Sequence, residues 1–592
     1  MAPNNSSLSP RLKGASVRSE SFRAKLPRIP TKWILLLSIV VLAAVAFLLR
    51  CLHLFDANHY YIISPDSYFF HWVARGIMAG QPPPATPGSD ITYTLHTGLA
   101  YPLAYLAKAV GYVFGSSPAE ALSLVSKFLP PVMAVISAIL IYLFAARISN
   151  RRVALLAVVT WVFLAHPVYF GSAGFLDRDG LSMLLFMTGA FLFYLSGVWH
   201  IRIRGRDVGW LIAGAGVLVM EALLYLEWSF AGPVLLLVVI AVYWIVRFVL
   251  GYADRMETEP DMKRRLTESI RHVNWSTFAL IVIVNILAAG LSFHQIGSWY
   301  GTAVDILRGG GKESASEAQG MGLGDVIAYQ LFLIPMVLGF YVSWKKRAES
   351  SIFFSCWFIT LFVMAIFARR ILIYAAPAAC LLSGVGLAFL WDWVKRGQFR
   401  MFKRIGMAVL IVLALFYSLV IALSLPAAYG MSPDRQWQDA LAWLRDNNNT
   451  PEDAVVMSQW SWGYWILDLG QRRPVVDNGY YNHDTERLHD VGIVYYTADP
   501  AEAAQNMEKY GASYLVFSEL DLENAPTIMG WANVGKGLAS FPEDSLIVRS
   551  LNGEFQSGGG LEVVYRSAPE PNSKTTSEPE VVILGLTQSG VP

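Results

Sequence analysis

Charged residues and cysteines are both scarce in this chain. Only 15% of its 592 residues are Asp, Glu, Lys or Arg, whereas 55% are hydrophobic, a balance too apolar for a water-soluble protein of this length. The three cysteines, Cys51, Cys356 and Cys380, lie in or beside apolar segments without the spacing of metal ligands, which argues against disulfides and against a cysteine zinc site. No basic stripe with interleaved aromatic residues occurs, which disfavours nucleic-acid binding.

Apolar runs long enough to cross a bilayer recur from Trp33 to Leu425 and then stop. We expect about 11 transmembrane helices, or about 13 if two short ones are hidden near 209–250. The single spans are placed at 33–53, 124–146, 153–170, 181–200, 209–226, 228–248, 275–294, 326–343, 352–368, 371–393 and 405–425. The stretch 97–113 breaks the parity if it is counted as a span, so it is interpreted as an interfacial or re-entrant helix.

Basic residues indicate which connections face the cytoplasm. The tail 1–32 is basic and rich in Ser, Pro and Asn, which predicts a disordered cytoplasmic segment. The positive-inside rule also places the connections that contain Arg151, Arg204, Arg255, Lys345 and Lys395 inside. The external side then holds the loops 54–123 and 295–325, the loop that precedes the span at 181, and everything after about residue 430.

Four acidic residues fall in these external loops: Asp66, Asp177, Asp179 and Glu317. A single loop acid is most often a solvated charge, and Glu317 also fits a capping box with Ser314. Together, however, convergent carboxylates at a membrane face are typical of a site for a hard divalent cation. They predict a metal-assisted enzyme that works outside the cytoplasm.

Several motifs resemble those of one family. Asp177-Arg178-Asp179 resembles the Asp-x-Asp signature of glycosyltransferases that use lipid-linked donors, and Asp66 follows the first span, where that class carries its first acid. The segment 459–463, Gln-Trp-Ser-Trp-Gly, stands where a Trp-Trp-Asp-Tyr-Gly signature is usual, and Val476-Asp477-Asn478-Gly479 follows it. Over nearly its whole length the chain resembles the catalytic subunit of oligosaccharyltransferase, in the single-subunit form of bacteria and archaea.

The resemblance implies roles for the acids and for an arginine pair. Asp66, Asp177, Asp179 and Glu317 would bind Mn²⁺ or Mg²⁺, and Asp66 and Glu317 would also accept hydrogen bonds from the acceptor amide. Arg370, with Arg369 beside it, opens a span from the outside and would face the donor pyrophosphate. Two external arginines run against the positive-inside trend, although binding of a lipid headgroup would also explain them.

The resemblance further implies an acceptor-binding set: Trp460, Ser461, Trp462, Gly463, Tyr464 and Ile528. In the family, an Asp at the position of Ser461 accepts a hydrogen bond from the Ser or Thr hydroxyl of the acceptor, so an uncharged Ser461 predicts a weaker contact. Ile528 ends a stretch from Asp521 that fits an Asp-x-x-Lys-x-x-x-Ile motif, except that Asn524 replaces the Lys. Alternatively, the aromatic residues merely pack a core.

These features predict a polytopic α-helical membrane protein of the GT-C type with a C-terminal mixed α/β domain. The expected domains are a basic cytoplasmic tail (1–32), a transmembrane catalytic domain (33–430), an extracytoplasmic acceptor-binding domain (431–567) and a loosely ordered tail (568–592). A helix near 436–447 and a strand at 514–518 are expected in the acceptor-binding domain.

The predicted activity is transfer of a glycan from a polyprenyl-(pyro)phosphate carrier to the side-chain amide of Asn in Asn-x-Ser/Thr sequons. It would proceed by metal-dependent inverting displacement at the plasma membrane, without other subunits. Two alternatives stay open: a GT-C glycosyltransferase that acts on a hydroxyl acceptor, and a non-catalytic paralogue that binds or transports a glycolipid.

Overall fold

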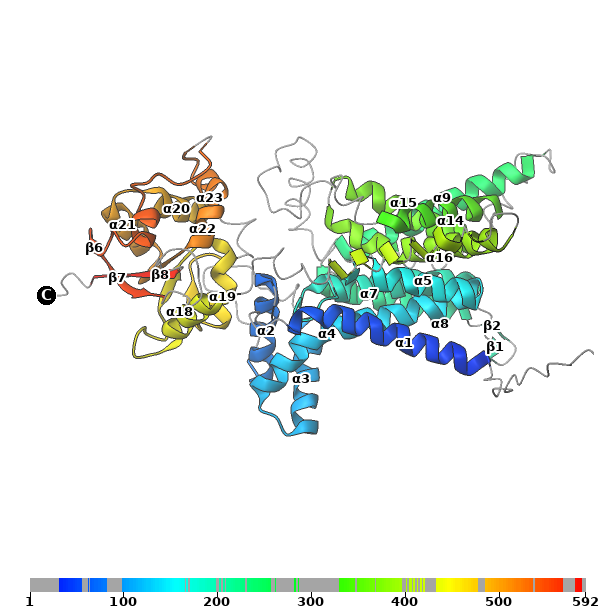
Figure 1. Ribbon diagram of the computed structural model, residues 1–592, viewed down its shortest axis with the longest axis horizontal. Helices are drawn as coiled ribbons and strands as arrows, with labels where there is room; N and C mark the ends of the chain where they lie inside the picture. Colours follow the sequence, from blue (N-terminus) through cyan, green and yellow to red (C-terminus); the bar gives the residue numbers. More distant parts are fainter. Residues whose placement is uncertain are drawn as a thin grey trace, which may run out of the picture.

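The structure is a computed structural model with two parts, a helical bundle and a C-terminal α/β region (Figure 1). It describes residues 31–55, 64–81, 98–164, 171–198, 209–228, 231–256, 330–346, 349–367, 369–396, 433–477, 485–535, 538–567 and 581–587, with shorter pieces between them. Glu317 and the whole loop 295–325 therefore lie outside the described residues, as do most of the predicted spans 275–294 and 405–425.

Helices occupy the other predicted spans. They are α1 (Thr31–Cys51), α4 (Pro118–Ile148), α5 (Arg151–Phe163), α7 (Arg178–Val198), α8 (Gly209–Trp228), α9 (Ala231–Met256), α14 (Gln330–Lys346), α15 (Glu349–Ala365) and α16 (Leu372–Lys395). Within the described ranges, four of them, α4, α7, α9 and α16, are long and apolar enough to cross a membrane. The short η1 (Leu52–Phe55) follows α1, and a small hairpin of β1 (Arg202–Ile203) and β2 (Arg206–Asp207) precedes α8.

Helix α16 is the most enclosed of the four candidate spans, with 78% of its apolar window buried. Glycines let the backbones of α14 and α16 come into direct contact. A Cβ on Gly386 would lie 1.7 Å from the Pro335 carbonyl oxygen, and a Cβ on Gly339 would lie 1.8 Å from the Leu382 carbonyl oxygen. Small residues allow such close approach where lipid supplies no hydrophobic drive between helices. The short η4 (Arg369–Ile371) leads directly into α16, so Arg370 is anchored at the start of this buried helix.

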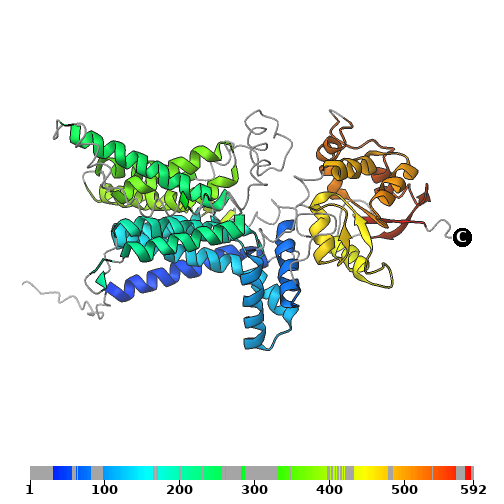
Figure 2. The same cartoon turned by 180° about the vertical axis from the view of Figure 1, so that it is seen from behind.

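Two helices of the first predicted external loop lie across the end of the bundle. These are α2 (Pro65–Met78) and α3 (Ala100–Phe114), and both views show them between the bundle and the C-terminal region (Figures 1 and 2). The stretch 97–113 does contain a helix, α3. Its inner face is buried at Leu103 and Ala104, whereas Tyr105 and Tyr112 on the other face are exposed.

The C-terminal region is built on a six-stranded sheet in the order β4-β3-β5-β8-β7-β6. Its strands are β3 (Val455–Met457), β4 (Arg473–Pro474), β5 (Tyr514–Ser518), β6 (Ser557–Gly558), β7 (Leu561–Arg566) and β8 (Val581–Leu586). β4, β3 and β5 are parallel, and the remaining pairs are antiparallel. The predicted mixed α/β region is thus confirmed, with the expected strand at β5.

Helices pack around this sheet. They are α18 (Arg435–Arg445), α19 (Gly463–Asp468), α20 (Thr485–Tyr496), α21 (Pro500–Lys509), α22 (Glu519–Glu523), α23 (Ala525–Trp531) and α24 (Leu546–Leu551), with the single turn η5 (Trp460–Trp462) before α19. The helix expected near 436–447 is α18, which begins where the Asp434 side chain accepts a hydrogen bond from the Trp437 N–H.

The prediction of a loosely ordered tail over 568–592 is wrong for residues 581–586. These residues form β8, which lies between β5 and β7 and is fully buried from Val581 to Leu584. The Pro, Glu, Ser and Thr content of the tail as a whole conceals a short β-branched run that completes the sheet. The α/β region therefore reaches at least Leu586.

The close approach of α14 and α16 yields a stability prediction. Gly386→Ala would place a methyl group against the Pro335 carbonyl and force the helices apart, at a cost of about 1–3 kcal/mol. We expect a lower melting temperature of the purified protein in detergent. The matched control is Gly76→Ala on α2, where a Cβ meets nothing within 4 Å; an unchanged melting temperature for Gly386→Ala would contradict the close packing.

Candidate active site

At one end of the bundle, two acids and an arginine from distant segments meet. The Nε–H of Arg370 donates to Asp179 Oδ2 at 2.8 Å, and its Nη2 lies 3.3 Å from Asp177 Oδ2. Both carboxylates are almost fully buried, with 5% of the Asp177 and 2% of the Asp179 side chain exposed. Two buried carboxylates two residues apart repel each other, and the guanidinium offsets that repulsion.

The local structure explains where these acids lie. Asp177 precedes α7 and Asp179 is in its first turn, where the partial positive charge of the helix N-terminus favours carboxylates. Arg370 comes from η4 at the head of α16, so the ion pairs join two helices whose sequences lie almost 200 residues apart. Only the backbone of the neighbouring Arg369 is described.

Asp66 occupies the first turn of α2, behind Pro65, and is partly buried. Within the described residues, no three His, Cys, Asp or Glu side chains lie close enough together to hold a metal ion. Of the four predicted metal ligands, the structure brings together Asp177 and Asp179. Their carboxylate oxygens are of the kind that Mg²⁺ and Mn²⁺ prefer, and in this structure both carboxylates bind Arg370.

A buried arginine that the sequence did not single out holds the segment before Asp177. Arg50, near the end of α1, is fully buried and donates from Nε to the Pro167 carbonyl at 3.2 Å and from Nη1 to the Ala46 carbonyl at 3.0 Å. Its own carbonyl accepts from the Ala173 N–H. An arginine at the end of an apolar span was the available signal.

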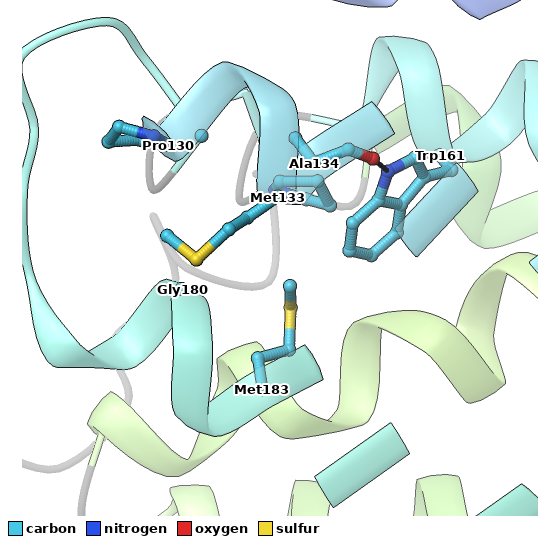
Figure 3. A pocket seen from close by; sticks show the side chains of 8 residues that line it. Pro130, Met133, Ala134, Trp161, Gly180 and Met183 are labelled. Carbon is cyan, nitrogen blue, oxygen red and sulfur yellow. Dashed lines mark hydrogen bonds between the residues drawn. The ribbon is translucent and has the colours of Figure 1, made fainter. Parts of the chain in front are cut away.

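Next to this segment is a small apolar cavity (Figure 3). Its lining includes Gly171, and Gly180, which directly follows Asp179. The Trp161 indole at its edge donates to the Ala134 carbonyl at 3.0 Å, so the only polar group of that side chain is satisfied within the bundle. The cavity thus borders the residue that directly follows Asp179.

The predicted acceptor-binding segment lies at one edge of the C-terminal sheet. Residues 458–462 follow β3, Val475–Asp477 follow β4, and α22 follows β5, so three connections leave the carboxyl ends of neighbouring parallel strands, the usual place for a ligand in such sheets. Gly463 is required there: a Cβ would lie 2.4 Å from the Val476 carbonyl oxygen. The structure thus brings the two family motifs into direct contact.

Ser461 is held by its neighbour Gln459 through two reciprocal hydrogen bonds. The Gln459 Nε2–H donates to Ser461 Oγ at 3.0 Å, and the Ser461 N–H donates to Gln459 Oε1 at 2.9 Å. Both side chains are buried. Because the hydroxyl oxygen already accepts a hydrogen bond from Gln459, Ser461 can offer its proton as a donor, whereas a carboxylate at that position could only accept.

Trp462 is packed into the core and paired with a buried acid. Its indole Nε1–H donates to Asp521 Oδ1 at 2.7 Å, and the Ser518 N–H donates to Asp521 Oδ2 at 2.8 Å. Burial raises the pKa of Asp521 to about 7, against the lowering effect of these hydrogen bonds. In the sequence, Asp521 stands out only as the first residue of the Asp-x-x-Lys-x-x-x-Ile stretch, and nothing there indicates that it is buried.

The remaining acceptor-binding candidates differ in exposure. Trp460 is only partly buried and its ring lies against Trp531 at 6.0 Å. Tyr464 is buried and packs on Phe69 of α2 at 5.1 Å. Ile528 is fully buried and belongs to a different core cluster from Trp462. The alternative of core packing therefore describes Trp462, Tyr464 and Ile528 in this structure.

Comparison with known proteins identifies related sequences and a shared fold. No family model matches the chain. A segment of 157 residues, 26% of the chain, is 29% identical to "Dolichyl-phosphooligosaccharide-protein glycotransferase 1" of Pyrococcus furiosus, of which it spans only 14%. A crystal structure of the Archaeoglobus fulgidus oligosaccharyltransferase tethered with an acceptor peptide superposes with a TM-score of 0.69 at 14% identity, covering 94% of this chain and 89% of that one.

The chain has the fold of the archaeal oligosaccharyltransferases. ArnT from Cupriavidus metallidurans, bound to undecaprenyl phosphate, also superposes, with a TM-score of 0.52 at 13% identity over 95% of this chain and 99% of that one. The predicted GT-C class is thus confirmed, as is the resemblance to oligosaccharyltransferase catalytic subunits. The protein is a membrane protein built on this glycosyltransferase fold.

The raised pKa of Asp521 predicts how stability depends on pH. Between about pH 4 and 7 the folded protein holds a proton on Asp521 that the unfolded chain releases, so raising the pH through this window lowers the free energy of unfolding. Asp521→Asn should flatten the fall in melting temperature over that window, although the variant is less stable overall because an amide NH2 faces the Ser518 N–H. The exposed Asp544→Asn should keep the wild-type slope; an unaltered slope in Asp521→Asn would rule out this titration.

Proposed function

We propose that the protein is an oligosaccharyltransferase that transfers a glycan from a polyprenyl-(pyro)phosphate to the side-chain amide of asparagine in Asn-x-Ser/Thr. The observation that supports this best is the meeting of Asp177, Asp179 and Arg370, since the resemblance assigns the two acids to the metal and the arginine to the donor. Two of the sequence relatives are dolichyl-phosphooligosaccharide-protein glycotransferases.

The donor end of the site would use both carboxylates and a guanidinium. Asp177, Asp179, Asp66 and Glu317 would hold Mn²⁺ or Mg²⁺, which would supply Lewis-acid stabilisation to the pyrophosphate leaving group. Solved structures of archaeal oligosaccharyltransferases from Archaeoglobus fulgidus include one with Zn and sulfate and one with a dolichol-phosphate. Arg370 would divide its guanidinium between the two aspartates and a phosphate oxygen, which a planar donor with five N–H groups allows.

The acceptor poses a different problem, because the lone pair of a carboxamide nitrogen is delocalised into its carbonyl. Asp66 and Glu317 would accept hydrogen bonds from the amide NH2 and favour a twisted, more nucleophilic nitrogen. The nitrogen then attacks the anomeric carbon with inversion. The carbon–nitrogen bond forms as the carbon–oxygen bond to the diphosphate breaks, and the nitrogen gives up one proton to a neighbouring carboxylate.

The acceptor polypeptide would bind at the sheet edge that carries Trp460–Tyr464, with Trp460 as its partly exposed aromatic surface. Ile528 was assigned to this pocket by the resemblance alone, and for it to reach the peptide α23 would have to shift. We further propose that the site and the C-terminal region face the extracytoplasmic side of the plasma membrane, and that the chain acts without other subunits.

One observation favours a second candidate, a GT-C transferase with a hydroxyl acceptor. Ser461 carries no charge and its oxygen already accepts from Gln459, so the pocket lacks the carboxylate that reads the sequon hydroxyl in the family. ArnT, which has a related fold, is not named as a protein glycosyltransferase. The remaining alternative, a glycolipid-binding paralogue without activity, would have no use for the paired acids.

Transfer of a lipid-linked oligosaccharide to a fluorescent Asn-x-Thr peptide by the purified protein, with added Mn²⁺, tests the proposal. Asp66→Asn, Asp179→Asn and Arg370→Met should each lower the rate at least about 100-fold, because each removes charge that stabilises the transition state. A chelator should abolish transfer, and the exposed Glu452→Gln should have no effect. Transfer to a peptide with Gln in place of Asn, or to hydroxyl acceptors only, would refute the proposed acceptor.

Restoring the family's carboxylate tests whether residue 461 contacts the hydroxyl of the acceptor peptide. Ser461→Asp should raise kcat/KM for an Asn-x-Thr peptide about 10-fold, because a charged acceptor strengthens a hydrogen bond by about 1–2 kcal/mol. The Gln459 amide can still donate to the new carboxylate. The same comparison on an Asn-x-Ala peptide is the control and should show no gain; an equal gain on both peptides would show that position 461 does not contact the hydroxyl.

A further inference from the structure

A buried carboxylate outside the motifs joins the two parts of the proposed site. Asp468 ends α19, the short helix that starts at Gly463, and its side chain is fully buried. It accepts from His71 Nδ1 at 2.8 Å and from Arg75 Nη2, and its backbone carbonyl accepts from the same Arg75 nitrogen at 2.7 Å. His71 and Arg75 lie one turn apart on α2, the helix whose first turn carries Asp66.

The rest of the contact between α2 and α19 is aromatic. Tyr68 packs edge-on against Trp465 at 6.3 Å between ring centroids, and Phe69 packs against Tyr464 at 5.1 Å. Trp465 in turn lies 4.6 Å from Trp462. Ring contacts stabilise the interface but tolerate several orientations, so they alone do not determine how α2 is rotated or shifted along α19.

The ionic contact removes that freedom. An ionised carboxylate can only accept hydrogen bonds, so His71 Nδ1 and Arg75 both donate to Asp468. Three hydrogen bonds from two successive turns of α2 thus converge on this one residue. Burial increases the energetic penalty for leaving Asp468 unpaired, because a carboxylate out of water without its partners is strongly destabilising. The orientation of α2 is thereby set by α19.

We propose that Asp468, through His71 and Arg75, is a positioning residue that holds Asp66 of α2 at a set distance from the acceptor segment Trp460–Tyr464. The inference rests on the proposed function, in which Asp66 must reach the amide of a peptide bound at that segment. Donor binding at Asp177, Asp179 and Arg370 and peptide binding at Trp460 use residues outside this contact. Most of the binding contacts therefore stay in place when the contact with Asp468 is weakened, so kcat falls more than the affinity for peptide or donor.

The first arm of the test measures kinetics. Asp468→Asn and Arg75→Ala should each lower kcat for peptide glycosylation about 10- to 100-fold, the cost of a misplacement near 1 Å, with a much smaller change in the peptide Kd measured by fluorescence anisotropy. The double variant should lose no more than the worse single variant, because both act through one contact. Arg75→Lys keeps the charge and should recover part of the rate; Glu508→Gln, an exposed acid of the same region, is the control.

The second arm measures geometry and needs no activity. Spin labels at Lys108→Cys on α3 and Asp453→Cys before β3, both at exposed positions, should give a narrow distance distribution that Asp468→Asn broadens. An unchanged distribution, or a peptide affinity that falls in step with kcat, overturns the inference. If the wild type transfers no glycan, the proposed function fails, and the distances alone still decide whether Asp468 fixes α2. Should Asp468→Asn not fold, Arg75→Ala, which removes the ion pair at a side chain that is partly exposed, replaces it in both arms.

Discussion

The ion pairs of Arg370 with Asp177 and Asp179 set the constraint around which the donor end of the structure is arranged. Two nearly buried carboxylates at the start of α7 are tolerable only with a cation beside them. The cation is supplied from η4, and η4 is in place because α16 runs through the bundle against α5 and α14. The glycine contacts of α16 therefore matter to the site: if that helix shifts outward, Arg370 moves with it and the acids lose their counter-charge.

The acceptor end follows a different electrostatic design. Its two buried carboxylates lie outside the segment Trp460–Tyr464: Asp521 accepts a hydrogen bond from Trp462, and Asp468 accepts one from His71 of α2. The side chains at the sheet edge itself, Gln459 and Ser461, are neutral and bonded to each other. Charge in this region thus holds elements in position, whereas at the bundle end the charged side chains meet one another in a single cluster, Asp177 and Asp179 with Arg370. In the proposed function, that cluster serves the metal ion and the phosphate of the donor.

Much of this architecture could be predicted from the sequence. Apolar runs predict the positions of α1, α4, α5, α7 and α16 because a bilayer requires a certain length of apolar helix, and the resemblance selects Asp177, Asp179 and Arg370, which meet in the fold. The position of Arg50 at the end of an apolar span is a signal for burial, but it does not identify the carbonyls that Arg50 binds. The burial of Asp468 and Asp521 could not be predicted, because an isolated acid gives no sign of whether it is buried or of which distant segment it meets. β8 was missed for a related reason: averaging over a polar tail hides six residues whose pairing partners in β5 lie 63 to 71 positions earlier in the sequence.

The two departures from the family signature at positions 459 and 461 are one change in the structure. Counted along the sequence, a Gln for a Trp and a Ser for an Asp are independent mismatches. In the fold, the Gln459 carboxamide accepts from the Ser461 backbone and donates to its hydroxyl, so each residue satisfies buried polar groups of the other. A Trp at 459 could not serve Ser461 in this way, and a Ser at 461 without Gln459 would have a buried hydroxyl oxygen to satisfy. Gln459→Trp alone would therefore remove the acceptor of the Ser461 N–H, whereas Ser461→Asp keeps an acceptor for the Gln459 amide.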